Sequence, residues 1–200
     1  MDTPPVHAAR LLGDLGAAAA VVPMLSALAS TSWAEILHDA ILTSLPKIGA
    51  PVVEPALRLL AETDEQDVRG SVRSVLSQLG IRDERIRDAL TAELEDDIGF
   101  AAMHLANYGD ASVLPHLRAA FDREPISHER AFANQGLIEL KDAIEHLGGK
   151  LTLKQQEKFE AAMEVERSMR GGAGDDEDED DAGIPARVEK KPGRNERTPQ

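Results

Sequence analysis

The residues whose types and spacing could do chemistry are few. Glu35 and His38 form a Glu-x-x-His pair, a spacing that puts both side chains on one helical face and supplies half of a di-iron carboxylate site. A second Glu-x-x-His is absent, so we expect His38 to pack or lie exposed instead. The stretch GGKLT at 148–152 lacks a Gly at position 144 and a hydroxyl residue directly after Lys150, so it predicts an inter-helix turn rather than a phosphate loop.

The remaining polar residues also lack a catalytic pattern. None of the other histidines lies in a His-x-x-x-His pair with a nearby carboxylate, and there is no Gly-x-Ser-x-Gly elbow; they are His7, His104, His116, His128 and His146. The chain has no cysteine, which excludes disulfides, thiolate zinc sites and cysteine nucleophiles. We therefore predict no catalytic residues, no metal and no cofactor, and a protein that is not an enzyme.

Composition and charge narrow the partners. The formal net charge is −14, and such a surface repels phosphate backbones and anionic membranes. We therefore expect neither nucleic acid nor a membrane as partner. We expect a protein partner, and a basic one would complement the negative charge of this chain. Aromatic residues make up only 3% of the chain, so the core must be aliphatic, which favours helices packed on helices.

Residues 11–30, LLGDLGAAAAVVPMLSALAS, resemble a secretory signal peptide at first sight. Gly13, Asp14 and Gly16 interrupt the apolar run that such a signal requires. The stretch also recurs along the chain, as described next. We therefore predict that it is the first packed unit of the fold, and that the protein is cytoplasmic.

A pattern with a period near 30 residues runs through the chain. LLGDLGAAAAVVPMLSAL (11–28) is followed by LTSLPKIGAPVVEPALRLL (42–60), VLSQLGIRDERIRDALTAEL (75–94), HLANYGDASVLPHLRAAF (104–121) and a worn fifth copy, GLIELKDAIEHL (136–147). The marker position falls at Gly16, Gly49, Gly80, Gly109 and, in the worn copy, Lys141. Helical patterning at this period is typical of a stack of helix pairs.

Each copy predicts two helices joined by a short turn. The glycine ends the first helix in the left-handed conformation, and Pro23, Pro55 and Pro115 lie near the start of the second. The first helices of the later copies are expected within 32–49, 64–80, 96–109 and 127–141. One buried stripe is expected on each second helix, formed by Val53, Leu57 and Leu60; by Ile86, Leu90 and Leu94; and by Val113, Leu117 and Phe121.

This pattern resembles the HEAT-like repeats of the type found in bilin-lyase-like (PBS-lyase-type) proteins. The resemblance rests on Asp67-Val68-Arg69, Leu79-Gly80 and Tyr108-Gly109-Asp110 with Pro115 and Leu117, and it covers residues 6–147. It implies an all-α fold, an armadillo-like α-solenoid or right-handed α-α superhelix of about five helix pairs. It implies no activity, because fold does not determine function.

The C-terminal part changes in character. Residues 151–169 predict a helix that covers the last repeat, with Thr152 and Gln155 as a capping box, so that the solenoid domain spans 1–169. Residues 170–200 contain DDEDEDD at 175–181 and are predicted to be a disordered acidic and polar tail. Residues 190–196 resemble the opening of a SEC-C motif, a zinc-binding tail, but Thr198 and Gln200 stand where it has cysteines. A degenerate remnant of this kind implies bacterial cytosolic ancestry.

The sequence therefore predicts a monomeric, non-enzymatic scaffold or adaptor that binds its partner on the concave face. We expect the second helices to form that face, with candidate partner-binding residues just off the buried stripes: Glu54, Arg58, Arg87, Thr91, Arg118 and Asp122. Two alternatives stay open. One is a lyase-like or enzyme accessory factor, which needs a deep pocket with converging histidines and carboxylates. The other is a translation- or secretion-associated factor that works through its C-terminal tail.

Overall fold

The computed structural model describes residues 3–129 and 132–171, and this part of the chain is all-α. Its α-helices are α1 Pro4–Asp14, α2 Val21–Ser30, α3 Ile36–Ile48, α4 Val53–Glu62, α5 Gln66–Ser77, α6 Glu84–Ala92, α7 Ile98–Tyr108, α8 Leu114–Arg123, α9 Gln135–His146 and α10 Leu153–Gly171. Four 3-10 turns lie between them: η1 Ala18–Ala20, η2 Ala50–Val52, η3 Glu93–Glu95 and η4 Ala111–Val113. None of the described helices is long and apolar enough to cross a membrane.

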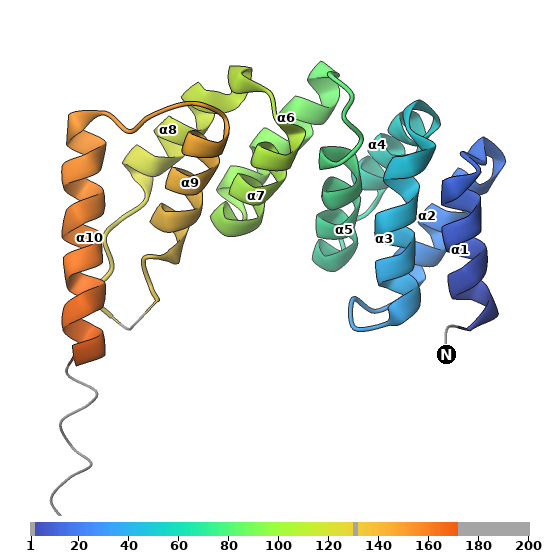
Figure 1. The fold of residues 1–200 in the computed structure, drawn as a ribbon, viewed down its shortest axis with the longest axis horizontal. Coiled ribbons are helices and arrows are strands. Elements are labelled where there is room, and N and C mark those ends of the chain that lie inside the picture. Colours follow the sequence, from blue (N-terminus) through green and yellow to red (C-terminus); the bar gives the residue numbers. More distant parts are fainter. Residues whose placement is uncertain (1–2, 130–131, 172–200) are drawn as a thin grey trace, which may run out of the picture.

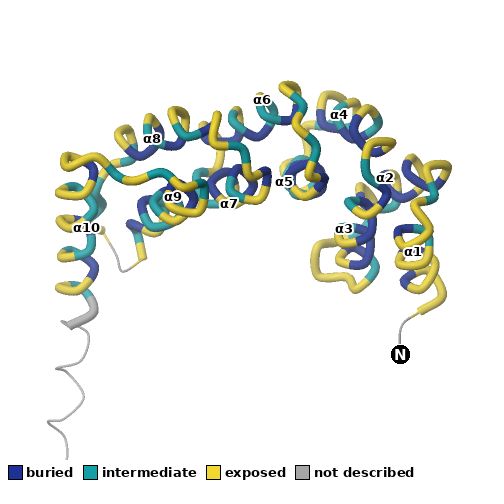
Figure 2. The backbone as a smooth tube through the Cα atoms, turned by 45° about the horizontal axis from the view of Figure 1, so that its top comes forward, coloured by how far each residue is buried: buried dark blue, intermediate teal, exposed yellow. Residues whose placement is uncertain are grey.

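The helices form a curved array of two layers. Helices α1, α3, α5, α7 and α9 lie side by side in one layer, α2, α4, α6 and α8 form the other, and α10 stands at the end beside α9 (Figure 1). Buried residues of the two layers face each other (Figure 2). The odd-numbered helices lie on the inner side of the curve. The prediction that the second helices form the concave side was therefore wrong.

The core is one continuous, mainly aliphatic cluster that runs from Val6 to Ala162. The predicted stripes are confirmed: all nine residues pack in it, and Leu57 is the one that stays half-buried. Phe121 is the largest fully buried side chain. Because each helix buries one stripe against the opposite layer, no single pair could hide its apolar surface alone.

Glycines with positive φ follow the first helix in each of the first four pairs, as predicted. Gly16, Gly49, Gly80 and Gly109 have φ between 62° and 78°, a conformation that costs glycine little. Gly109 is left-handed helical, whereas Gly49, with ψ at −136°, lies outside the left-handed helical region that was predicted. In α7 the Asp97 side chain accepts a hydrogen bond from the Phe100 N–H at 3.1 Å at one end, and Gly109 closes the other. Residues 11–30 form the end of α1, η1 and α2, with Leu25 and Leu28 in the core, as expected.

The fifth unit differs from its prediction. Lys141 lies inside α9 rather than at a helix end, and the glycine with positive φ is Gly148, at 78°. The described residues between α8 and α9 form no helix, so the spacing from Gly109 to Gly148 lengthens to 39 residues (148 − 109). Buried Asn134 and Glu166 hold this connection: Asn134 exchanges hydrogen bonds with the Ser127 backbone, and Glu166 accepts from the Asn134 N–H at 3.1 Å.

The helix predicted at 151–169 is confirmed as α10, and its capping box is complete. The Gln155 N–H donates to the Thr152 hydroxyl at 3.3 Å, and the Thr152 N–H donates to the Gln155 side chain at 3.1 Å. Lys158 attaches α10 to α8 by donating to the Phe121 carbonyl at 2.7 Å. Helix α10 runs to Gly171, two residues into the predicted disordered tail of 170–200. The rest of that tail, 172–200, and the SEC-C resemblance lie outside the described residues.

Close packing of α1 on α3 depends on Gly13, and this gives a test. A Cβ at Gly13 would lie 2.7 Å from Ser44 Cβ and 2.8 Å from the Ser44 carbonyl oxygen. Alanine for glycine inside a helix normally stabilises by up to about 1 kcal/mol, but Gly13→Ala is expected to destabilise by about 1–3 kcal/mol because of this clash. Gly70→Ala in α5 is the matched control, since nothing lies within 4 Å of its Cβ position, and it should stabilise. Urea unfolding measures both; equal signs for the two variants would contradict the packing argument.

Candidate functional site

The inner face of the array carries a groove of about 1000 Å³. It runs across the N-terminal and middle turns of α3, α5 and α7, with the loop before α3 at one end and η3 beside α7. Ligand sites are typically concave and combine apolar surface with a few placed polar groups. The groove is therefore the candidate ligand-binding site in the described part of the chain.

A buried polar network forms part of its lining. Arg73 of α5, Glu93 of η3 and His104 of α7 each expose 3% or less of their surface. The two carboxylate oxygens of Glu93 divide the pairing: one lies 3.5 Å from an Arg73 guanidinium nitrogen, and the other lies 2.7 Å from His104 Nδ1. Asp96 lies 3.6 Å from Arg73 on the exposed side. A buried charge requires a partner, and this pairing joins α5, η3 and α7 at the floor of the groove.

The local sequence explains how these side chains meet. The turn η3 follows α6 directly and carries Glu93 beneath α7, because the short link to Asp97 makes the chain reverse there. His104 occupies a place on the buried face of α7, and Arg73 lies between the buried Val72 and Val75 of α5. Sequence reasoning missed all three, because they share no motif spacing. The available signal was a charged or imidazole residue at an otherwise apolar helical position.

His38 also lies in the groove wall, with 4% of its surface exposed. Its Nδ1 lies 3.2 Å from the Thr31 hydroxyl, and its Nε2 lies 3.0 Å from the Ser71 hydroxyl. Glu35 turns away and accepts a hydrogen bond from the Ser32 N–H at 2.8 Å. The Glu35-His38 pair is thus not brought together as a ligand set, and His38 is a packed, hydrogen-bonded residue.

The Ser71–His38 contact lacks the third group of a catalytic triad. The Ser71 hydroxyl oxygen lies 2.8 Å from the Asp67 carbonyl oxygen and 3.0 Å from His38 Nε2. The other imidazole nitrogen, His38 Nδ1, faces the Thr31 hydroxyl and not a carboxylate that would orient the base. Among residues 3–129 and 132–171, no three His, Asp or Glu side chains are grouped so as to hold a metal ion.

The rim of the groove is acidic and aromatic. Five carboxylates line the rim: Asp39, Asp67, Glu95, Asp96 and Asp97. A sixth, Glu93, lies buried at the floor, and Arg73 is the one Lys or Arg among the described lining residues. Trp33 is 77% exposed, Phe100 58% and Met103 42%. Phe100 also stacks on His104, with ring centroids 6.2 Å apart. Large apolar side chains left in water beside carboxylates favour a ligand that is both cationic and apolar.

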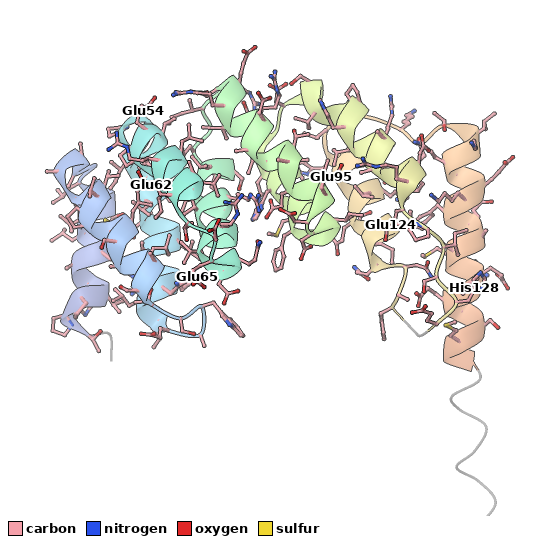
Figure 3. All side chains as sticks on the ribbon, turned by 180° about the vertical axis from the view of Figure 1, so that it is seen from behind. Glu54, Glu62, Glu65, Glu95, Glu124 and His128 are labelled. Atoms are coloured by element: carbon pink, nitrogen blue, oxygen red, sulfur yellow. The ribbon has the colours of Figure 1, made fainter. Side chains whose placement is uncertain are left out.

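The residues proposed from the sequence lie on the other layer. Glu54 and Arg58 are on α4, Arg87 and Thr91 on α6, and Arg118 and Asp122 on α8. Figure 3 shows Glu54 at the outer edge of the array, whereas Glu95 lies near its middle. Glu54 pairs with Arg85 at 2.6 Å, and Arg87 with Asp88 at 2.9 Å.

Two of these residues hold the end of the array together. Arg118 donates to the Lys150 carbonyl at 2.9 Å, and Asp122 accepts from the Gln155 side chain at 3.0 Å. The structure thus brings the six residues into no common hollow. The chain matches no protein-family model and no curated protein.

Proposed function

We propose that the protein is a non-enzymatic scaffold or adaptor that binds a basic, partly apolar segment of a protein partner in the groove across α3, α5 and α7. The observation that carries the proposal is the acidic rim around exposed Trp33, Phe100 and Met103. Aromatic side chains and Met are enriched at the centres of protein interfaces, and charge complementarity steers association. The same charge works against nucleic acid, whose backbone would meet carboxylates.

The fold class that fits this role is a HEAT-like α-solenoid. Paired helices in chain order, four glycine-closed turns 29 to 33 residues apart and a single shared core support it. Such stacks present extended concave surfaces to partners. In this reading the inner, odd-numbered helices supply the binding surface.

A lyase-like or enzyme accessory role is the second candidate. His38, His104 and Glu93 do converge on one groove, which is the arrangement that such a role requires. Against it, Glu93 already has both Arg73 and His104 as partners, and His38 Nδ1 faces the Thr31 hydroxyl instead of a carboxylate. The third reading, a translation- or secretion-associated factor, depends on the tail beyond residue 171 and stays a prediction.

Affinity capture with the full chain tests the proposal and separates the two layers. Phe100→Ala and Asp67→Lys change the groove, whereas Glu54→Lys and Arg58→Glu change the outer layer at comparable exposure. Each groove variant should bind the partner protein about tenfold more weakly and capture correspondingly less of it, which is the equivalent of about 1.4 kcal/mol at an interface. The outer variants should retain it. Loss only with Glu54→Lys and Arg58→Glu would place the binding surface on the second helices and overturn the groove.

A further inference from the structure

The most basic part of the C-terminal tail matches the groove in charge. Residues 187–197, RVEKKPGRNER, carry five Lys or Arg and two Glu, a net charge of +3 in a chain whose total is −14. Of the six carboxylates in the groove lining, Glu93 is buried and paired, Glu95 pairs with Arg123 and Asp96 with Arg73. The other three, Asp39, Asp67 and Asp97, are exposed. Like charges suppress binding and opposite charges promote it. We propose that this segment of the same chain occupies the groove and competes there with the basic segment of a partner.

The geometry of the array permits this contact. The groove lies toward the N-terminal ends of α3, α5 and α7, and α10 runs the opposite way, so its last residue leaves from that same edge (Figure 1). Three packed steps, α10 to α9, α9 to α7 and α7 to α5, separate the two places. At roughly 10 Å a step the distance is about 30 Å. Residues 172–186 can span up to about 50 Å when extended.

Tethering also favours the contact energetically. A segment joined by a short linker is present at an effective concentration in the millimolar range, so even weak electrostatic binding is populated. The acidic run 175–181 lies between α10 and the basic segment. Because like charges repel, this run is expected to keep clear of the acidic groove and to extend the linker rather than occupy the site.

The inference rests on the groove being a binding surface, as proposed above. It adds that the surface is regulated in cis: a partner must displace residues 187–197 before it binds. Removing the basic charge of the tail would then raise partner affinity, whereas a purely passive tail would leave affinity unchanged.

The chain supplies an unusually direct probe for this. Trp33 is the single tryptophan and lines the groove, and the chain has no cysteine. Thr198→Cys in the full chain can therefore carry one nitroxide, a short-range quencher of tryptophan fluorescence. We expect the nitroxide to remove about half of the Trp33 emission relative to a diamagnetic label, the occupancy when a millimolar effective concentration meets a millimolar dissociation constant. Emission should recover at about 1 M salt, where the Debye length falls to about 3 Å.

Matched charge reversals decide the outcome. Asp39→Lys with Asp67→Lys should abolish the quenching, while Glu54→Lys on the outer layer should leave it intact. Quenching that is absent at low salt, or that survives the groove reversal, overturns the inference; a basic segment held by the acidic run 175–181 would give the first of these results. The capture experiment tests the proposed function independently. If the wild-type tail label does not quench Trp33 but Phe100→Ala still loses the partner, tail occupancy is rejected and the proposed function stands.

Discussion

Replacing Glu93 by alanine is expected to lower the free energy of unfolding by about 3–5 kcal/mol, the cost of leaving a buried charge, the Arg73 guanidinium, without its partner. The carboxylate of Glu93 is shared between Arg73 and His104, which are both buried. Without it, the guanidinium of Arg73 keeps only Asp96 at 3.6 Å, whose side chain is half-exposed and screened by water. Arg73 Nε already has no hydrogen-bond partner, so little remains to compensate the loss.

Glu95→Ala is the matched control, because Glu95 lies two residues away in the same turn η3 and pairs with Arg123 at 2.7 Å on the surface. That exposed pair should contribute no more than about 1 kcal/mol. Urea unfolding of both variants measures the contrast. A triple apolar variant, Arg73→Met with Glu93→Leu and His104→Leu, should recover much of the stability, since no charge is left unpaired. Equal losses in the free energy of unfolding for Glu93→Ala and Glu95→Ala would show that the buried pairing contributes no more than an exposed ion pair.

The helix pairs were predictable because their signals are local. A glycine that closes a helix and a proline that opens the next act through their own backbone, so Gly16, Gly49, Gly80 and Gly109 could be recognised without knowing any contact. The fifth unit broke the rule because a non-helical connection precedes α9. Gly148 is the glycine with positive φ after α9, but it lies 39 residues (148 − 109) from Gly109, a spacing that a constant period near 30 does not predict.

The site was not predictable by the same means. Which layer is the inner one depends on how closely the helices within each layer approach, and that is a property of long-range packing. The odd-numbered helices pack on one another more closely than the even-numbered ones, helped by Gly13 against Ser44, so the array bends toward them. Arg73, Glu93 and His104 come from three elements, and only this packing brings them together.

Substitutions of Phe121 and Phe100 are expected to affect stability and binding separately. Phe121→Ala should destabilise the protein by about 3–5 kcal/mol. Phe121 is fully buried between the layers, and the Lys158 ammonium lies 5.7 Å from its ring centroid, so its loss opens a cavity where α8 meets α10. Phe100 is more than half exposed on the groove rim, and Phe100→Ala should change stability by no more than about 1 kcal/mol.

Partner capture should show the reverse order. Phe121→Ala, measured on its folded fraction, should keep the partner, because its side chain does not reach the groove surface. Phe100→Ala should lose it by about tenfold. Urea unfolding and capture of the same two preparations give both comparisons at once. If Phe100→Ala proved as destabilising as Phe121→Ala, the exposed ring would serve to hold α7 in place. That result would contradict the proposal that the Phe100 ring contacts a partner. A stable Phe100→Ala that no longer binds would instead show that this ring faces water in order to meet a partner.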